Sequence, residues 1–145
     1  MTTERKDASS YLPIVGLMAL FVIVPVVGGV WAVQPIDVEL TKDALVVHSV
    51  RYGRAFPRPE IKGIERLDRL PPIRKIRGYS MGGSLRGQFQ VEGLGAGLVF
   101  AERRRPPFIV VHHQDGFVVF NLDRPGATEA LYEELKPQLS RPSEP

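Results

Sequence analysis

The longest apolar stretch of the chain covers residues 11–33, which contain no charged side chain. As an α-helix this stretch would extend for about 34 Å, enough to cross a bilayer core that is about 30 Å thick. Tyr11 and Trp31 lie near its two ends, where aromatic side chains favour the membrane interface. The pattern predicts a single-pass membrane protein with an N-terminal tail (residues 1–10), a transmembrane helix (residues 11–33) and one further domain.

A cleaved signal peptide is the alternative interpretation of this stretch, because residues 30–32 (VWA) place small residues at a suitable spacing. The apolar run exceeds the roughly 7–15 residues typical of signal peptides, so a retained anchor is favoured. Arg5 and Lys6 precede the stretch, whereas only Lys42 lies in the fifteen residues after it. The excess of positive charge before the span favours, by a single residue, a domain on the outer side of the membrane.

Beyond Pro35 the apolar positions alternate with polar ones, which is typical of half-buried strands. Residues 36–41 and 44–50 predict a hairpin with a turn at residues 41–43. Residues 51–56 predict a third strand that ends before Pro57, and residues 61–70 a fourth. The glycine-rich residues 78–97 predict turns around one short strand at 88–91. Later strands are expected at residues 97–103, 108–112 and 117–122, the last two joined by an Asp-Gly turn.

One amphipathic helix follows the predicted strands. Asp123 or Arg124 is expected to cap it, with Pro125 in the first turn, and Pro137 is expected to end or kink it. The chain therefore predicts a mainly β domain (residues 36–139), an antiparallel barrel or sandwich with one C-terminal helix, followed by a tail (residues 140–145). We expect one core with these members: Leu45, Val47, Phe89, Val99, Ile109, Val111, Val118, Phe120, Leu131 and Leu135.

The order of strands followed by one helix, with the motifs Gly87-Gln88-Phe89 and Tyr52-Gly53-Arg54, resembles the bacterial PH-like domain family, part of the pleckstrin-homology superfold. An Asp-Gly hairpin and an Asp-x-Pro helix start strengthen this resemblance over residues 36–139. The resemblance implies a PH-like fold tethered by an N-terminal membrane helix. The predicted first loop holds Lys42 beside Asp43, whereas inositol-lipid-binding PH domains gather several basic residues there. The resemblance therefore does not imply recognition of inositol-lipid headgroups.

Catalytic chemistry has little support in the sequence. The absence of cysteine excludes disulfides, thiolate metal sites and cysteine nucleophiles. Gly78 and Gly83 have the spacing of a phosphate-binding loop, but Ser84 stands where the essential lysine is required. His112 and His113 are adjacent on a predicted strand, so their side chains point to opposite faces and do not easily share a metal ion. We expect no metal, no cofactor and no enzymatic activity; a small hydrolase or transport accessory is the least favoured alternative.

Positive charge is concentrated in residues 51–105, which hold thirteen Lys or Arg and five Asp or Glu, a net charge of +8. The remainder of the chain has a net charge of −5. Two groups follow or precede proline pairs and are expected in exposed loops: Arg74, Lys75, Arg77, Arg103, Arg104 and Arg105. If both loops emerge at one end of the domain, six cations converge on one anion-binding surface.

Two kinds of partner are compatible with these charges, a protein and an anionic lipid surface. An interaction module would bind an acidic protein partner or a second copy of the chain. If the domain faces the cytoplasm, a lipid reader would instead contact the anionic leaflet, where each basic residue contributes about 1 kcal/mol. Nucleic acid is not expected as a partner of a membrane-tethered domain.

Overall fold

The computed structural model describes residues 13–19, 35–49 and 53–140. The chain divides into two compact units between Gln34 and Pro35, and residues 13–19 of the first unit are helical. Among the helices in these described ranges, none is long and apolar enough to cross a membrane. Tyr11, Trp31 and most of the span 11–33 lie outside the described residues, as do both chain ends, so the transmembrane helix stays a prediction.

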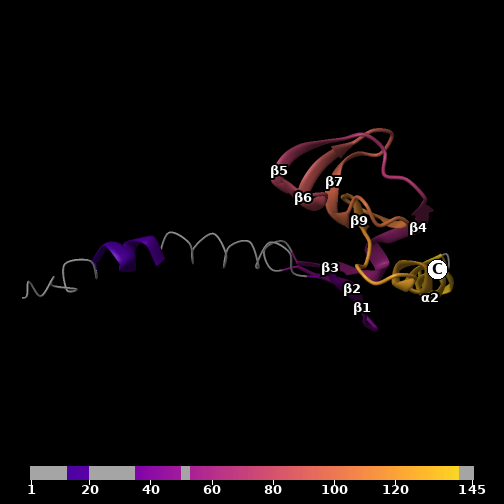
Figure 1. Cartoon of the computed structure of the whole chain (residues 1–145). Coiled ribbons are helices and arrows are strands. Elements are labelled where there is room, and N and C mark those ends of the chain that lie inside the picture. The colour runs from indigo at the N-terminus through magenta and orange to yellow at the C-terminus, as the bar shows by residue number, and fades with distance from the viewer. Residues whose placement is uncertain (1–12, 20–34, 50–52, 141–145) are drawn as a thin grey trace, which may run out of the picture. The chain divides into compact units, whose positions relative to one another are not determined.

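A three-stranded antiparallel sheet begins the second unit (Figure 1). Its strands are β1 (Asp37–Leu40), β2 (Ala44–His48) and β3 (Arg54–Pro57). The β1–β2 hairpin confirms the alternating pattern, and its turn is closed by Thr41, whose Oγ1 accepts from the Ala44 amide at 3.0 Å. Pro57 belongs to β3 instead of ending it, because β3 is an edge strand, where a missing amide donor is tolerated.

The remaining strands form a six-stranded sheet in the order β4-β8-β9-β7-β6-β5. The strands are β4 (Ile61–Leu67), β5 (Ile73–Met81), β6 (Ser84–Val91), β7 (Gly95–Glu102), β8 (Phe108–His113) and β9 (Gly116–Phe120). The expectation of a wholly antiparallel domain is wrong at one place, because β7 and β9 run parallel. The β8–β9 hairpin lies between β4 and β7, so β7 meets β9 and not β8, its successor in the chain.

The glycine-rich segment forms a long hairpin, and the prediction of turns around one short strand is wrong. Gly82 and Gly83, with φ of 61° and 95°, make the two-residue turn between β5 and β6. Both angles fit a type I′ turn, which matches the right-handed twist of the strands it joins. The other glycines of this hairpin, Gly78 and Gly87, lie within paired strands.

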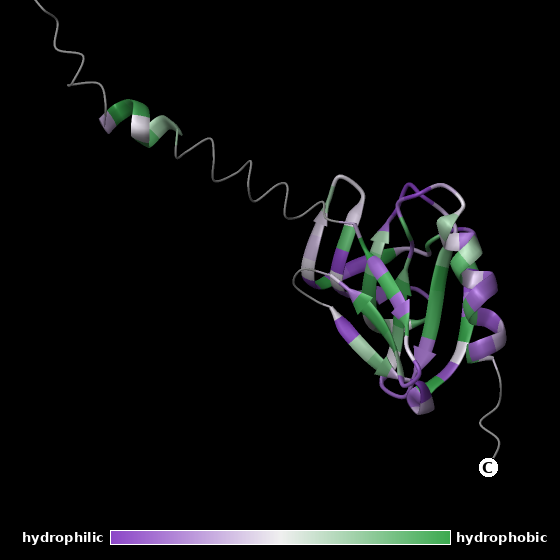
Figure 2. Ribbon diagram, turned by 90° about the horizontal axis from the view of Figure 1, so that it is seen from below, coloured by the Kyte–Doolittle hydropathy of each residue, from purple (hydrophilic) through white to green (hydrophobic). Residues whose placement is uncertain are grey.

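Buried apolar side chains form two clusters on opposite faces of the six-stranded sheet, and the prediction of one core is wrong. The interlayer cluster lies between the six-stranded sheet on one side and the three-stranded sheet and the C-terminal helix on the other. Its members are Ile36, Leu45, Val47, Phe56, Phe100, Ile109, Val111, Val118, Phe120, Leu135 and Leu139. The concave cluster comprises Leu85, Phe89, Val91, Val99, Ala101, Phe108, Val110, Phe117 and Val119. Successive strand residues point to opposite faces, so Phe89 and Val99 join the concave cluster. Figure 2 shows hydrophobic residues running through the central strands.

Both edge strands contribute to the concave cluster, since Leu67 of β4 and Ile73 of β5 pack against it. The six-stranded sheet therefore curls around the concave cluster. The opposite face is covered in part by α2 (Ala127–Leu139), which packs on β4 and β8.

The C-terminal helix confirms the amphipathic prediction but begins later than expected. Gly126, in the left-handed conformation, is its N-cap, and neither Asp123 nor Arg124 caps it. Leu135 is fully buried and Leu131 is half-buried. Pro137 lies inside the helix, which continues to Leu139.

Candidate functional site

The basic residues Arg74, Lys75 and Arg77 lie on strand β5, so the prediction that they occupy a loop is wrong. All three side chains are exposed, as predicted. β5 is the last strand of its sheet, and among the described residues it pairs with β6 alone. The cations are therefore held on a strand edge, where the backbone fixes their spacing.

A bulge in β5 brings two of these cations to the same face. Arg74 pairs with Gln90 and Arg77 pairs with Gln88, while the register shift between Lys75 and Arg77 leaves Ile76 without a partner. Gln88 and Gln90 are two residues apart on β6 and point to one face. Arg74 and Arg77, three residues apart, consequently share that face, whereas a regular strand would place them on opposite faces.

Apolar side chains accompany the cations on β5. Ile76 is 49% exposed and Met81 is 67% exposed; within the described residues from 35 to 140 these are the large hydrophobic side chains that lie open to solvent. An open pocket of about 490 Å³ adjoins the start of the strand, with Ile73, Arg74 and Gln90 in its wall. The β5 edge thus offers positive charge and apolar surface together.

Arg103, Arg104 and Arg105 form an exposed turn after β7, which confirms the prediction for this group. The Arg103 amide donates to the Gly83 carbonyl at 2.8 Å, so this arginine turn lies beside the β5–β6 turn. Arg74 is seven residues before Met81, or about 23 Å along the strand at about 3.3 Å per residue. The two basic groups lie at different levels of the hairpin, so the six cations do not form a single cluster.

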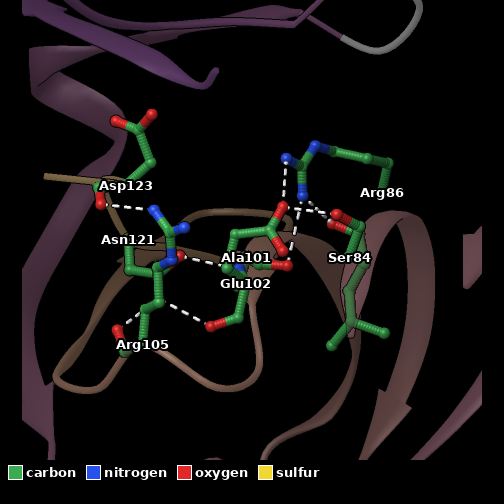
Figure 3. A network of polar contacts seen from close by, with 8 residues as sticks. Ser84, Arg86, Ala101, Glu102, Arg105, Asn121 and Asp123 are labelled. Carbon is green, nitrogen blue, oxygen red and sulfur yellow. Dashed lines mark hydrogen bonds and ion pairs between the residues drawn. The ribbon is translucent and has the colours of Figure 1, made fainter. Parts of the chain in front are cut away.

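The arginine turn is held in place by hydrogen bonds from Asn121 (Figure 3). Asn121 is 1% exposed. The side-chain amide of Asn121 donates to the carbonyls of Glu102, at 2.9 Å, and Arg105, at 2.7 Å. Its Oδ1 accepts from the Glu102 amide at 2.8 Å. The guanidinium of Arg105 also donates to the Asp123 carbonyl. One buried amide therefore fixes the backbone that presents these arginines, and nothing in the sequence pattern singles it out.

Arg86 belongs to a buried ion pair, although the count of basic residues in 51–105 gives it the same weight as the exposed arginines. Its side chain is 9% exposed and lies 2.9 Å from the Glu102 carboxylate. It also donates to the Leu85 and Ala101 carbonyls, at 2.9 and 3.1 Å, and Ser84 Oγ donates to Glu102 at 2.5 Å (Figure 3). This network joins β6 to β7 and is structural.

A second open pocket, of about 410 Å³, lies between the arginine turn and the start of α2. Arg104, Arg105 and Arg124 contribute to its wall, together with Pro106 and Thr128. None of the ion pairs found in the described part of the chain involves these three arginines or the basic residues of β5. Their charge is therefore available to an anionic partner.

The neighbouring histidines face apart, as predicted. His113 is buried against Phe56, with ring centroids 4.8 Å apart, and its Nδ1 accepts from the Asp115 amide at 3.2 Å. Burial, followed by the positive charge of Arg54, lowers the pKa of His113. His112 instead has its Nε2 3.3 Å from the Glu65 carboxylate. Within residues 13–19, 35–49 and 53–140, no three metal-ligating side chains gather at one point.

Comparison of the chain with known protein families, with characterised proteins and with solved structures found no match.

Proposed function

We propose that this chain is a non-enzymatic, membrane-anchored interaction module that holds an acidic partner protein beside a membrane. The observation that carries the proposal is the basic, partly apolar edge of β5, where exposed Arg74, Lys75 and Arg77 lie beside exposed Ile76. Protein interfaces combine apolar contacts with such charged groups, whereas binding to phosphates alone requires no exposed isoleucine.

The proposal includes a PH-like fold for the domain. The resemblance in sequence and a mainly β domain with one C-terminal helix support it. The parallel pairing of β7 with β9 is a departure from a simple antiparallel meander. The anchor itself rests on the uncharged residues 11–33.

A lipid reader is the second candidate function, and the arginine turn favours it. Arg104, Arg105 and Arg124 line part of an open pocket of about 410 Å³, which is large enough for a phosphate headgroup. Asp123 is the one acidic residue in its wall, so the three arginines leave an excess of positive charge there. In this alternative the arginine turn binds anionic lipid and β5 remains unoccupied.

A binding assay distinguishes the two candidates. The full chain is placed in nanodiscs of neutral lipid and presented either with a polyglutamate peptide or with phosphatidylserine vesicles. We expect the wild type to bind the peptide, and a variant with Arg74→Glu, Lys75→Glu and Arg77→Glu to lose that binding. The matched variant with Arg103→Glu, Arg104→Glu and Arg105→Glu should retain most of it.

Each alternative result has a defined meaning in this assay. Binding to phosphatidylserine vesicles alone, abolished by the changes in the arginine turn, would replace the interaction module by the lipid reader. Failure to bind either probe at low salt would contradict both candidates.

A further inference from the structure

The side of β5 that faces away from β6 is the edge of the six-stranded sheet. β5 has nine residues and is the longest strand among those described. Its outer side faces no strand of the described residues, whereas β4, the other edge of the same sheet, packs against α2. An edge of this length presents a row of backbone donors and acceptors to any segment that can extend the sheet.

The hairpin geometry indicates which backbone groups face outward. The type I′ turn closes on the pair Met81 and Ser84, and hydrogen-bonded pairs alternate with non-bonded pairs along an antiparallel ladder. The amides of Ser80 and Gly78 belong to the non-bonded pairs and therefore point to the free edge. Ile76, at the bulge, marks where this regular stretch ends.

Proteins normally protect such edges with lysine, with a bulge or with a short strand. β5 has a lysine and a bulge, but it is long, and it exposes Ile76 and Met81 beside its cations. Apolar side chains on an edge make it more, not less, suitable for pairing. The combination is selective: the cations repel a basic strand and the apolar side chains add affinity for an extended acidic one.

We propose that β5 accepts an extended acidic segment of a partner protein as a seventh strand of the six-stranded sheet. The inference rests on the proposed interaction module and specifies its binding mode. Arg74, Lys75 and Arg77 select negative charge, residues 77–81 supply the backbone ladder, and Ile76 and Met81 contact apolar side chains of the added segment. A second copy of β5 is disfavoured as the occupant, because pairing would bring the cations of two copies together.

The test uses a peptide of roughly ten residues in which glutamate alternates with valine, long enough to pair with the strand. Its control is the same peptide with an N-methyl group on every residue, which keeps the charge but leaves no amide on either edge to donate to a ladder. Binding to the full chain in neutral nanodiscs is measured by fluorescence anisotropy. We expect the methylated peptide to bind at least about tenfold more weakly, since several backbone hydrogen bonds are lost.

Hydrogen exchange gives the second readout. The parent peptide should slow amide exchange in residues 73–81 and leave the arginine turn unchanged. Equal binding of both peptides, or unchanged exchange of β5 in the bound state, would overturn strand addition. If that binding still depended on Arg74, Lys75 and Arg77, the interaction module would stand without it. If the parent peptide did not bind at all, both proposals would fail.

Discussion

Gly78 and Gly87 face each other across the β5–β6 hairpin, so closely that a Cβ atom on either would lie 2.8 Å from the Cα of the other. Their φ angles, 137° and 131°, belong to a region that residues with a side chain rarely adopt. The two strands that carry the candidate binding edge therefore approach each other only because both positions are glycine.

Alanine in place of Gly78 should destabilise the domain. Gly78→Ala introduces a collision with the β6 backbone and a strained φ, and we expect a loss of about 1–3 kcal/mol in the free energy of unfolding. Chemical denaturation of the domain that starts at Pro35 measures the loss. Gly63→Ala is the matched control, because a Cβ at Gly63 meets no atom within 4 Å. Equal stability of the two variants would contradict the close approach.

Leu135 provides a test of how α2 packs on the sheet. It is fully buried in the interlayer cluster, so Leu135→Ala should lower the free energy of unfolding by about 2–5 kcal/mol. Leu131→Ala should cost less, since Leu131 is half-buried. The exposed Glu133 supplies the control, and Glu133→Ala should change stability by less than about 0.5 kcal/mol. A loss below that level for Leu135→Ala would show that the helix does not pack on the sheet.

The ion pair between Arg86 and Glu102 should respond unequally to removal of its two partners. Glu102→Ala leaves the buried guanidinium without its carboxylate, and we expect a loss of about 3–5 kcal/mol. Arg86→Met should cost less, because Glu102 is more exposed than Arg86 and keeps its bond to Ser84. Urea denaturation of both variants gives the order, and the reverse order would contradict a buried cation.

His113 should make stability depend on pH. Its pKa is lowered in the folded state, so the unfolded chain takes up a proton at a higher pH than the folded chain does. The contribution of His113 to the free energy of unfolding is fully present above the pKa of the unfolded chain, about 6.5. This contribution falls as the pH decreases from there towards the pKa of the folded state. Denaturation at a series of pH values should show this slope. His113→Gln should reduce it, and an unchanged slope in that variant would contradict the burial of His113.

The uncharged residues 11–33 predict that the full chain remains with membranes during alkaline carbonate extraction. A chain shortened to begin at Gln34 should be released as a folded domain, which circular dichroism can verify. Recovery of a mature N-terminus near Val33 would instead establish a cleaved signal peptide.

The sequence predicted the elements whose signals are local. Alternation specified the β1–β2 hairpin, the Asp-Gly pair specified the β8–β9 turn, and the spacing of Leu131 and Leu135 specified the helix face. The prediction of turns in residues 78–97 was wrong because Gly78 and Gly87 lie opposite each other in paired strands and do not form turns. The bulge at Ile76 depends on the same pairing and leaves no local signal.

Burial of charge was also beyond the sequence. A count of basic residues treats Arg86 like Arg104, although only the fold places a carboxylate and two carbonyls around the former. Asn121 is a single polar residue among apolar neighbours in the sequence. Its role becomes visible only when the fold brings the end of β7 and the arginine turn beside it.

The insertion of the β8–β9 hairpin between β4 and β7 has a consequence for biosynthesis. β5, β6 and β7 can pair with their neighbours in sequence as they leave the ribosome, but β4 ends at Leu67 and its strand partner within the described residues begins at Phe108. The emerging chain must keep β4 unpaired until that later segment arrives, and contacts so distant in sequence form slowly. Residues 108–120 are thus the piece that completes the sheet, and a chain truncated before them would expose two strand edges to aggregation.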